Sequence, residues 1–400
     1  MTTDKKDRIP NAPVLRFPEF ADGWKECELK DIAQISKGSG ISKDQLSETG
    51  KPCVLYGELY TKYKSEVITE ILSKTNLEES HMVYSRENDV IIPSSGETAV
   101  DISTARCVPF DNILLGGDLT IIRLKEQDGR FFSYQLNGVR KLDIARIAQG
   151  VSVVHLYGDN LKRLKVTFPT IAEQNKISVF LSLVDKRIET QSRVIEKLQS
   201  LIRGITQKVS KHPSVQKTML SDVLMERNDK NQKLLPVYSV SVSEGVVNQV
   251  EYLGRSFAAK DTSNYNVVYF GDIVYTKSPT GDFPFGIVKR SNNADKVAVS
   301  PLYGVYQPAS EDIGIYLHYY FCSSLNAKNY LHKLIQKGAK NTINITNQRF
   351  LENEVPIPDP LTLRKYVVLM TSLSKKLEQE KNLLALLQTQ KQFLLQEMFI

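Results

Sequence analysis

The chain contains fragments of motifs found in DNA-modifying and phosphate-binding enzymes, and none of them is complete. An adenine methyltransferase needs an Asn/Asp-Pro-Pro-aromatic loop that clamps a flipped base, but Asp359-Pro360 is followed by Leu361. A P-loop needs GxxxxGK(S/T), and residues 38–40 supply only GSG. Glu28-Leu29-Lys30 matches just the last part of a metal-nuclease motif. The sequence therefore predicts no catalytic residue.

The cysteines and histidines do not have the spacing of metal ligands. The five histidines are dispersed, and the four cysteines are Cys27, Cys53, Cys107 and Cys322. Free thiols are typical of a reducing compartment. The N-terminal residues lack a signal-peptide pattern, and no apolar run is long enough to span a membrane. These features predict a cytoplasmic protein without a metal site.

The distribution of charge favours a polyanionic partner. The formal net charge is +7. Residues 129–165 are rich in Lys and Arg, and residues 325–350 contain five of these cations and no acid. Either patch alone fits a solvated surface equally well. Because the same bias recurs at corresponding places in two halves of the chain, it favours nucleic acid.

Polar side chains on loops are the candidates for contacts with DNA. Arg reads guanine, Asn and Gln read adenine, and Lys and hydroxyl groups hold phosphate. His155 is interpreted as solvated or facing DNA, and the tyrosines at 56, 60 and 63 as sheet core or as base-stacking residues. In the first half the candidates are Lys37, Ser39, Ser42, Lys43, Tyr60, Lys62, Ser94, Ser95, Arg146, Gln149 and Ser152. In the second half they are Arg255, Lys260, Lys277, Ser278, Thr280, Lys340, Asn341 and Thr342.

Two long helices must position these loops. From Ile177 to Val209, alternating steps of four and three residues reach ten positions, nine of them apolar, and the exception is Gln191. Adding 189 to each number gives a second seam from Tyr366 to Met398, with eight apolar positions. Such heptad seams form one narrow stripe that seeks a partner helix. Ordinary amphipathic surface helices are the alternative.

The repeat extends into the segments before the helices. NDVIIPSSGE at 88–97 resembles GDIVYTKSPTGD at 271–282, and residues 149–170 resemble 337–360. These segments are mostly β-strand patterns bounded by Gly, Pro, Asn and Asp, with helices expected at 131–146 and 311–336. The pattern predicts α+β domains at 1–171 and 211–360, each a curved sheet, and helices at 172–210 and 361–400.

The arrangement resembles the specificity subunit of Type I restriction–modification systems. That family begins its first helix with Pro-x-x-Glu-Gln-x-x-Ile, matched here by Pro169, Glu173, Gln174 and Ile177 with one extra spacer residue. Leu181, Val184, Asp185 and Ile188 match a later LxxLDxxI element. Residues 14–38 look like the opening segment of the family. The second helix departs from the signature, because Thr362, Leu363 and Ser374 replace its Glu, Gln and Asp.

The resemblance implies an α+β fold in which two target-recognition domains are held apart by two helices packed as an antiparallel coiled coil. It implies a non-catalytic subunit whose domains each read half of an asymmetric bipartite DNA site. Two modification subunits with S-adenosylmethionine dock on the helices, and restriction subunits that use ATP and Mg join them. The residues assigned to helix contacts are Glu173, Gln174, Ile177, Leu181, Ile188, Leu198, Met370, Leu377 and Leu387. A coiled-coil scaffold and a stand-alone DNA enzyme remain alternatives.

Overall fold

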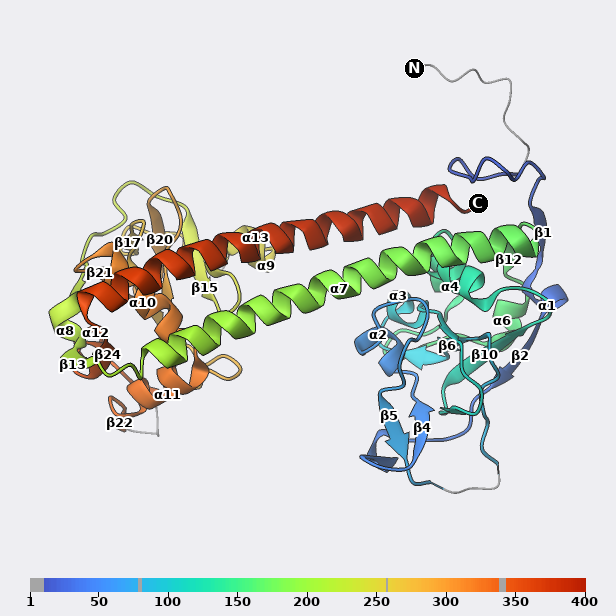
Figure 1. Cartoon of the computed structure of the whole chain (residues 1–400), viewed down its shortest axis with the longest axis horizontal. Helices are drawn as coiled ribbons and strands as arrows, with labels where there is room; N and C mark the ends of the chain where they lie inside the picture. Colours follow the sequence, from blue (N-terminus) through green and yellow to red (C-terminus); the bar gives the residue numbers. More distant parts are fainter. Residues whose placement is uncertain (1–10, 78–80, 257, 338–342) are drawn as a thin grey trace, which may run out of the picture. The chain divides into compact units, whose positions relative to one another are not determined.

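The chain folds into two compact units in a computed structural model, which describes all residues except 1–10, 78–80, 257 and 338–342. Unit 1 consists of Met1–Ser192 and Asn382–Ile400, and unit 2 of Arg193–Lys381. Two long helices, α7 (Ile171–Val209) and α13 (Pro360–Glu397), each contribute residues to both units. They are the green and red helices of Figure 1. The predicted domain limits remain a prediction.

The main sheet of unit 1 has four strands in the order β2-β10-β6-β8. These strands are β2 (Ala33–Lys37), β10 (Leu119–Leu124), β6 (Asp89–Pro93) and β8 (Arg106–Val108). A second sheet has the order β3-β5-β4-β9 and consists of β3 (Leu46–Ser47), β5 (Ser73–Thr75), β4 (Lys51–Val54) and β9 (Leu114–Leu115). Two further pairs are β1 (Lys25–Glu28) with β12 (Lys165–Phe168), and β7 (Ser95–Gly96) with β11 (Val154–His155).

Unit 2 repeats the strand order of this main sheet, whereas its second sheet has a different order. Its main sheet has the order β14-β21-β18-β19 and consists of β14 (Leu224–Glu226), β21 (Gly304–Pro308), β18 (Ile273–Thr276) and β19 (Ile287–Arg290). The second sheet is β16 (Gly245–Asn248), β15 (Val237–Ser241), β20 (Val297–Val299) and β17 (Asn266–Val268). The pairs are β13 (Gln216–Met219) with β24 (Glu354–Ile357), and β22 (Gln336–Lys337) with β23 (Ile343–Asn344).

The shorter helices complete each unit. In unit 1 they are α1 (Leu29–Ile32), α2 (Glu58–Thr61), α3 (Ala99–Ile102), α4 (Gly129–Asn137), α5 (Lys141–Ile147) and α6 (Gly158–Lys162), with a 3-10 turn η1 at Lys43–Gln45. In unit 2 they are α8 (Leu220–Val223), α9 (Gln249–Leu253), α10 (Glu311–Phe321), α11 (Ser324–His332) and α12 (Asn347–Phe350). The shared strand order and helix placement confirm the predicted α+β class and the internal repeat.

Two equivalent aspartates begin the central strands of the main sheets. Asp89 at the start of β6 and Asp272 just before β18 are each 1% exposed. Asp89 accepts two hydrogen bonds from Arg123, at 2.8 and 2.6 Å, and Asp272 accepts two from Arg227. Two parallel N–H···O bonds with fixed geometry compensate the cost of burying a carboxylate. The arginine lies on β10 in unit 1 and follows β14 in unit 2, so the same pair is built from different strands.

The heptad seams are where the two long helices are buried. All twenty seam positions predicted from the sequence are buried or half-buried. In unit 1, Ile177 and Leu181 of α7 share a core with Leu394 of α13. In unit 2, Ile202 of α7 shares a core with Met370 of α13. The start of one helix therefore packs with the end of the other in each unit, which is an antiparallel pairing (Figure 1).

Two details differ from the sequence interpretation. Each unit has two four-stranded sheets instead of one curved sheet. The helix expected at 131–146 divides into α4 and α5 at Gly138, where an added Cβ atom would lie 2.9 Å from the backbone oxygen of Leu395. The helix expected at 311–336 divides into α10 and α11 at Ser323, whose side chain accepts from the Asn326 N–H and caps the second helix. Tight packing and local capping, which periodicity does not reveal, cause both divisions.

Candidate nucleic-acid interface

The loops at one edge of the main sheet of unit 1 lie close together. Lys37 at the end of β2 pairs with Thr120 of β10, which pairs in turn with Ile92 of β6. The Ser94 hydroxyl, just after β6, lies 2.7 Å from the Thr120 hydroxyl. The ends of β2 and β6 and the start of β10 therefore share an edge. This edge brings together two of the predicted stretches, 36–43 and 94–96.

A hairpin reaches the same edge. Gln149 and His155 exchange backbone hydrogen bonds of 2.9 and 2.7 Å, β11 pairs with β7, and the Leu156 N–H donates to the Ser94 carbonyl. Gly150 has a φ of +126°, and an added Cβ atom would lie 2.1 Å from the Val153 backbone oxygen, so the turn requires glycine. The tip is solvated, with Val151 98% exposed. The hairpin therefore presents its tip residues for contact with a partner.

Two rings extend this surface beyond the hairpin. The rings of His155 and Tyr157 stack with centroids 6.2 Å apart, and both residues are exposed. Stacked, solvated rings next to a polar hairpin are suited to contact with bases or sugar. The sequence interpretation included His155 but missed Tyr157. The signal for Tyr157 was its spacing of two residues from His155, which places both side chains on the same side of an extended segment.

Unit 2 builds a corresponding hairpin from β22 and β23. Lys337 pairs with Ile343, so five residues separate the paired positions, as they do between Gln149 and His155. In both units the hairpin is followed by a short helix, a strand and a long helix. Lys340, Asn341 and Thr342 lie outside the described residues, so their predicted contacts stay predictions.

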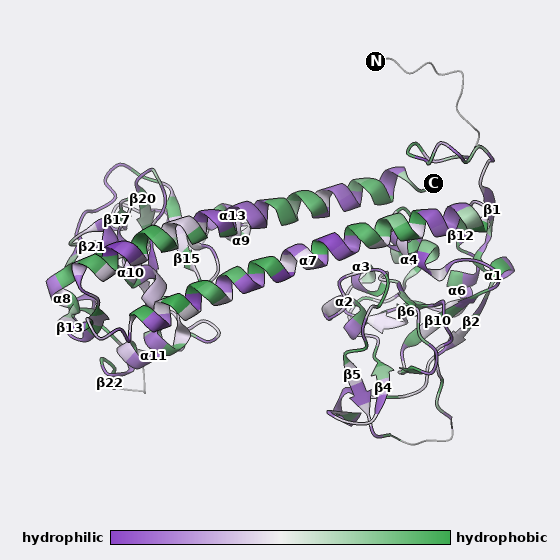
Figure 2. Ribbon diagram, viewed as in Figure 1, coloured by the Kyte–Doolittle hydropathy of each residue, from purple (hydrophilic) through white to green (hydrophobic). Residues whose placement is uncertain are grey.

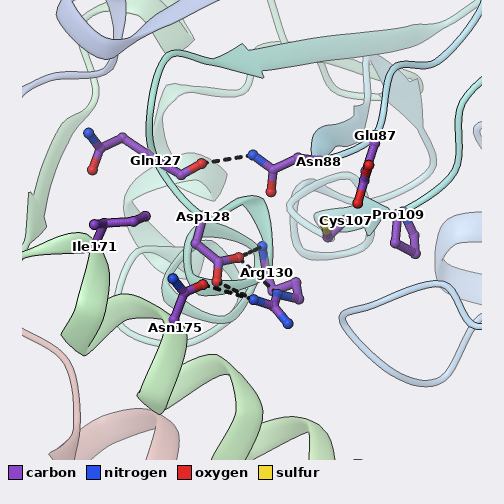
Figure 3. A pocket seen from close by; sticks show the side chains of 9 residues that line it. All are labelled: Glu87, Asn88, Cys107, Pro109, Gln127, Asp128, Arg130, Ile171 and Asn175. Carbon is purple, nitrogen blue, oxygen red and sulfur yellow. Dashed lines mark hydrogen bonds and ion pairs between the residues drawn. The ribbon is translucent and has the colours of Figure 1, made fainter.

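The start of α7 is fixed to unit 1 by the residues of the helix signature. Glu173 is 1% exposed and accepts two hydrogen bonds of 2.7 Å from Arg16. Gln174 accepts from the Asp128 N–H and donates to the Gln127 side chain and the Pro169 carbonyl. Next to them, Figure 3 shows a pocket in which Arg130 contacts Asp128 and the Asn175 side chain. These contacts hold the helix on the domain that precedes it.

Comparison with known proteins shows which family the first half of the chain resembles. Residues 21–200 match the family model described as the Type I restriction modification DNA specificity domain. The match covers 180 of the 400 residues, a little under half of the chain. A protein of Haemophilus influenzae named as a type I restriction enzyme specificity subunit is 26% identical over 164 residues, 40% of each chain. The MjaVIII specificity subunit of Methanocaldococcus jannaschii is 23% identical over 233 residues, 55% of this chain and 50% of that one. The chain spans about half the length of these curated relatives, or less.

Solved structures share the fold over nearly the whole chain. The Type I restriction–modification S subunit from M. genitalium superposes with a TM-score of 0.62 at 16% identity, covering 97% of this chain and 99% of that one. A chain from a structural study of assembly of the type I R-M system has a TM-score of 0.54 at 13% identity and covers 96% and 98%. The resemblance seen in the sequence is therefore confirmed, and the fold is that of specificity subunits.

The specificity domain of unit 1 exposes some of the predicted DNA contacts and buries others. Lys37, Ser42, Lys43, Lys62, Arg146, Gln149 and Ser152 are exposed, and Tyr60 is half-buried. Ser94 and Ser95 are only 7% exposed, and the half-buried Ser39 hydroxyl bonds the backbone of Val83 and Leu115. The Ser94 and Ser39 hydroxyl groups are hydrogen-bonded within the domain and Ser95 is buried. Their contact with DNA stays a prediction. In unit 2, Arg255, Lys260, Ser278 and Thr280 are exposed, and Lys277 is half-buried.

The basic patch predicted at 129–165 is largely neutralised by acids. Two of these acids, Glu26 and Asp128, lie outside residues 129–165 along the chain, and the fold brings them close. The ion pairs are Arg130–Asp128, Arg140–Asp143, Arg146–Asp143, Lys162–Asp159 and Lys165–Glu26. Exposed pairs of this kind contribute little stability and exchange partners at small cost. The patch is therefore less positive than counting along the sequence suggested.

The helix-contact residues fall into two groups. Ile177, Leu181, Met370 and Leu387 are buried, and Ile188, Leu198 and Leu377 are half-buried. Glu173 and Gln174 were assigned to helix pairing, but their hydrogen bonds go to Arg16 and to the loop at Gln127–Asp128. These hydrogen bonds lie within unit 1, and the assignment of both residues to helix contacts stays a prediction.

A buried ionic cluster joins α13 to the specificity domain and to α7. The Lys391 Nζ atom lies 2.6 Å from Asp185 Oδ1 and also pairs with Glu66, and the three side chains are 8–9% exposed. The Tyr134 hydroxyl donates to Asp185 at 2.7 Å. In unit 2 the equivalent of Asp185 is Ser374, which contacts the Tyr319 hydroxyl. The aspartate of the helix signature is thus one half of a charged contact that only unit 1 contains.

Among the described residues, no group of three or more His, Cys, Asp or Glu side chains is arranged to hold a metal ion. No helix in the described part of the chain has the length and apolar character needed to span a membrane.

Proposed function

We propose that the chain is the DNA specificity subunit of a Type I restriction–modification complex in the cytoplasm. Each unit reads one half of a bipartite DNA site, and the chain supplies recognition without catalysis. The family match of residues 21–200 supports this class of protein. The observation that carries the two-part site is the hairpin pairing of Gln149 with His155 in unit 1, which recurs as the pairing of Lys337 with Ile343 in unit 2. Residues 150–154 read GVSVV and residues 338–342 read GAKNT, and this difference favours two different half-sites.

The partners in this proposal supply the chemistry. Two modification subunits bring S-adenosylmethionine and methylate adenine, and restriction subunits use ATP and Mg to cleave DNA. The surfaces of α7 and α13 beside the seam are the proposed docking sites. In unit 1 they expose Val179, Leu183, Leu386 and Phe393, and in unit 2 Leu361, Val368 and Leu369. Figure 2 shows apolar and hydrophilic residues alternating along both helices.

The docking sites follow the repeat. Val179 and Val368 stand at the same position of the two helices, 189 residues apart. Exposed apolar residues in a row along a helix mark an interaction site more often than scattered ones do. One exposed apolar position thus recurs on both helices, which fits two copies of one partner, the stoichiometry that the proposal requires.

The direct test is to map methylated adenines in DNA from cells that express the chain with its modification partner. The proposal expects methylation at one asymmetric motif with two specified parts and a gap of fixed length. Methylation by the chain alone would instead support a stand-alone enzyme. A chain that binds partners but shows no salt-sensitive binding to any bipartite duplex would be a protein scaffold, because contacts with phosphates make binding depend on salt.

Hairpin substitutions should change one half-site at a time. Gln149→Ala and Ser152→Ala leave the backbone bonds of the first hairpin intact and should relax base choice in the first half-site, each lost base contact being worth roughly 1–3 kcal/mol. Asn341→Ala should do the same in the second half-site. Lys340→Ala should weaken binding to all sequences and reduce the salt slope by about one. Sequencing of methylated motifs measures the effects, and the unaltered half-site is the internal control. Unchanged motifs in all these variants would remove the hairpins from the interface.

Charged residues in the apolar stripe should abolish assembly without unfolding the chain. Leu183→Asp and Leu386→Asp alter side chains that are 61% and 68% exposed. An unpaired charge buried in an interface costs several kcal/mol, so co-purification with the modification subunit should fall at least tenfold. Lys186→Asp on the exposed face of α7 serves as the control for added charge. Normal assembly of the Leu183→Asp and Leu386→Asp double variant would place the docking site elsewhere.

A further inference from the structure

Cys322 lies in a cluster of three side chains that the DNA-reading role does not use. It follows α10, and Lys289 lies on the neighbouring strand β19. The Lys289 Nζ atom donates to the Cys322 Sγ atom at 3.3 Å, and the His318 Nε2 atom lies 3.8 Å from the same sulfur. Cys322 is half-buried and is not in a disulfide. The sulfur therefore has two polar neighbours that can hydrogen-bond to it.

The ammonium group of Lys289 needs an anion at this place. Lys289 is 5% exposed, and in the described part of the chain no carboxylate lies within ion-pair distance of it. A buried, unpaired ammonium group is costly unless a counter-charge accompanies it. Among the residues that the structure describes, the Cys322 sulfur is the polar partner of its Nζ atom. A thiolate at Cys322 supplies the missing negative charge.

His318 acts as a neutral hydrogen-bond donor in this geometry. Its Nδ1 atom accepts the Arg290 backbone N–H at 3.1 Å. A nitrogen that accepts carries no proton, so the proton of a neutral ring lies on Nε2, facing the sulfur. The positive charge is therefore assigned to Lys289. Burial by itself raises the pKa of the Cys322 thiol, whereas the hydrogen bond from His318 and the charge and hydrogen bond of Lys289 lower it and favour the thiolate.

The other groups around the sulfur do not replace Lys289. Tyr319 of α10 and Tyr366 of α13 lie near it, and burial raises the pKa of each phenol, so both stay neutral. The Arg290 guanidinium is bound by Asn292 and Glu311. The C-terminal end of α10 carries partial negative charge, which opposes a thiolate. Lys289 is thus the group on which the thiolate depends.

We propose that Cys322, Lys289 and His318 form a reactive thiolate site whose substrate is a peroxide. The thiolate attacks one peroxide oxygen, so an S–O bond forms while the O–O bond breaks. The departing hydroxide takes the sulfenic acid proton and leaves as water. The sulfur loses two electrons, the peroxide gains them, and Lys289 pairs with the resulting sulfenate. Reaction of this kind follows thiolate character and exposure and is reversible by thiols.

The test uses the full chain and compares its own cysteines. Cys27 is also half-buried, but burial and the acids Asp31 and Glu26 raise the pKa of its thiol. Alkylation by iodoacetamide at pH 6 is quantified for each cysteine by peptide mass spectrometry. It should be about tenfold faster at Cys322 than at Cys27, and this factor already includes the lower nucleophilicity of a low-pKa thiolate. Hydrogen peroxide followed by dimedone should label Cys322 and leave Cys27 unlabelled. Equal alkylation rates at pH 6 would overturn the proposal.

A charge-removing variant identifies the role of Lys289. Lys289→Met fills similar space without an ammonium group, and it should raise the pH midpoint of Cys322 alkylation by at least one unit and reduce dimedone labelling at least fivefold. Cys322→Ser shows which labelled peptide is the site. An unchanged midpoint in a folded Lys289→Met chain would remove the lysine from the site. If that variant does not fold, the comparison of Cys322 with Cys27 in the natural chain still decides the proposal.

Discussion

Replacing Lys391 by methionine will destabilise unit 1 by about 3–5 kcal/mol at neutral pH, the cost of removing one partner from a buried ion pair. The methionine occupies similar space but leaves Glu66 and Asp185 inside the protein without the ammonium group that pairs with both. Arg106 is also buried nearby, but its guanidinium donates to the carbonyls of Leu59 and Tyr63. The two carboxylates therefore have no substitute for the lysine.

The penalty should depend on pH in a defined direction. Burial raises the pKa of Asp185, the charge of Glu66 raises it further, and Lys391 opposes both effects. Without the lysine, the pKa of Asp185 in the folded chain rises more. A carboxyl group with a raised folded pKa takes up a proton on folding, so stability falls as pH rises above its unfolded pKa of about 3.9. The difference between natural chain and variant should be largest near pH 7 and shrink toward pH 4.

The single tryptophan reports on this part of the molecule. Trp24 is 3% exposed and contacts Phe399 just beyond the end of α13, with ring centroids 6.3 Å apart. Its fluorescence during urea denaturation follows the unfolding of unit 1. Lys186→Met, at an exposed position of α7, is the control and should change the free energy of unfolding by less than about 0.5 kcal/mol. A loss below 1 kcal/mol in Lys391→Met would show that the carboxylates are solvated or protonated in the natural chain.

Lys391 also shows where sequence reasoning reached its limit. The heptad pattern placed it in the seam, and the structure buries it there, because seam positions depend only on local helix geometry. Its partner Glu66 is 325 residues away. Such a pairing results from the whole fold, and no spacing along one chain encodes it.

In the candidate site, too, the sequence predicted the local features but not those that depend on the whole fold. The repeat between residues 149–170 and 337–360 located both hairpins, since each depends on a short stretch of chain. Whether a side chain faces solvent was not predictable: Ser94 is buried against Thr120 because β6 and β10 are neighbours. The neutralising acids Glu26 and Asp128 were missed for the same reason. Residue type and turn chemistry are local, whereas burial and charge pairing are properties of the assembled sheet.

A heptad inserted into each long helix will lengthen the gap between the two half-sites. The insertions go between Ile188 and Ile195 in α7 and between Leu377 and Leu384 in α13. Seven residues keep both seams in phase, so the antiparallel pairing survives. Each helix gains about 10 Å at 1.5 Å per residue, which equals roughly three base pairs at about 3.4 Å per pair. We expect unchanged half-sites and a gap one to three base pairs longer, because the tilt of the helices against DNA determines how much of the added length is used.

The methylated motif of the variant complex measures the gap, and matched insertions separate length from disruption. An insertion of four residues in each helix shifts the seams out of phase and should abolish assembly, since apolar positions then face solvent. A heptad inserted in α7 alone makes the two helices unequal in length, and this variant should also fail to assemble. Because α7 and α13 each continue without interruption between units 1 and 2, added turns must either separate the recognition surfaces or break the pairing. A folded, methylating variant of the double insertion that keeps the original gap would show that the helices do not set the spacing.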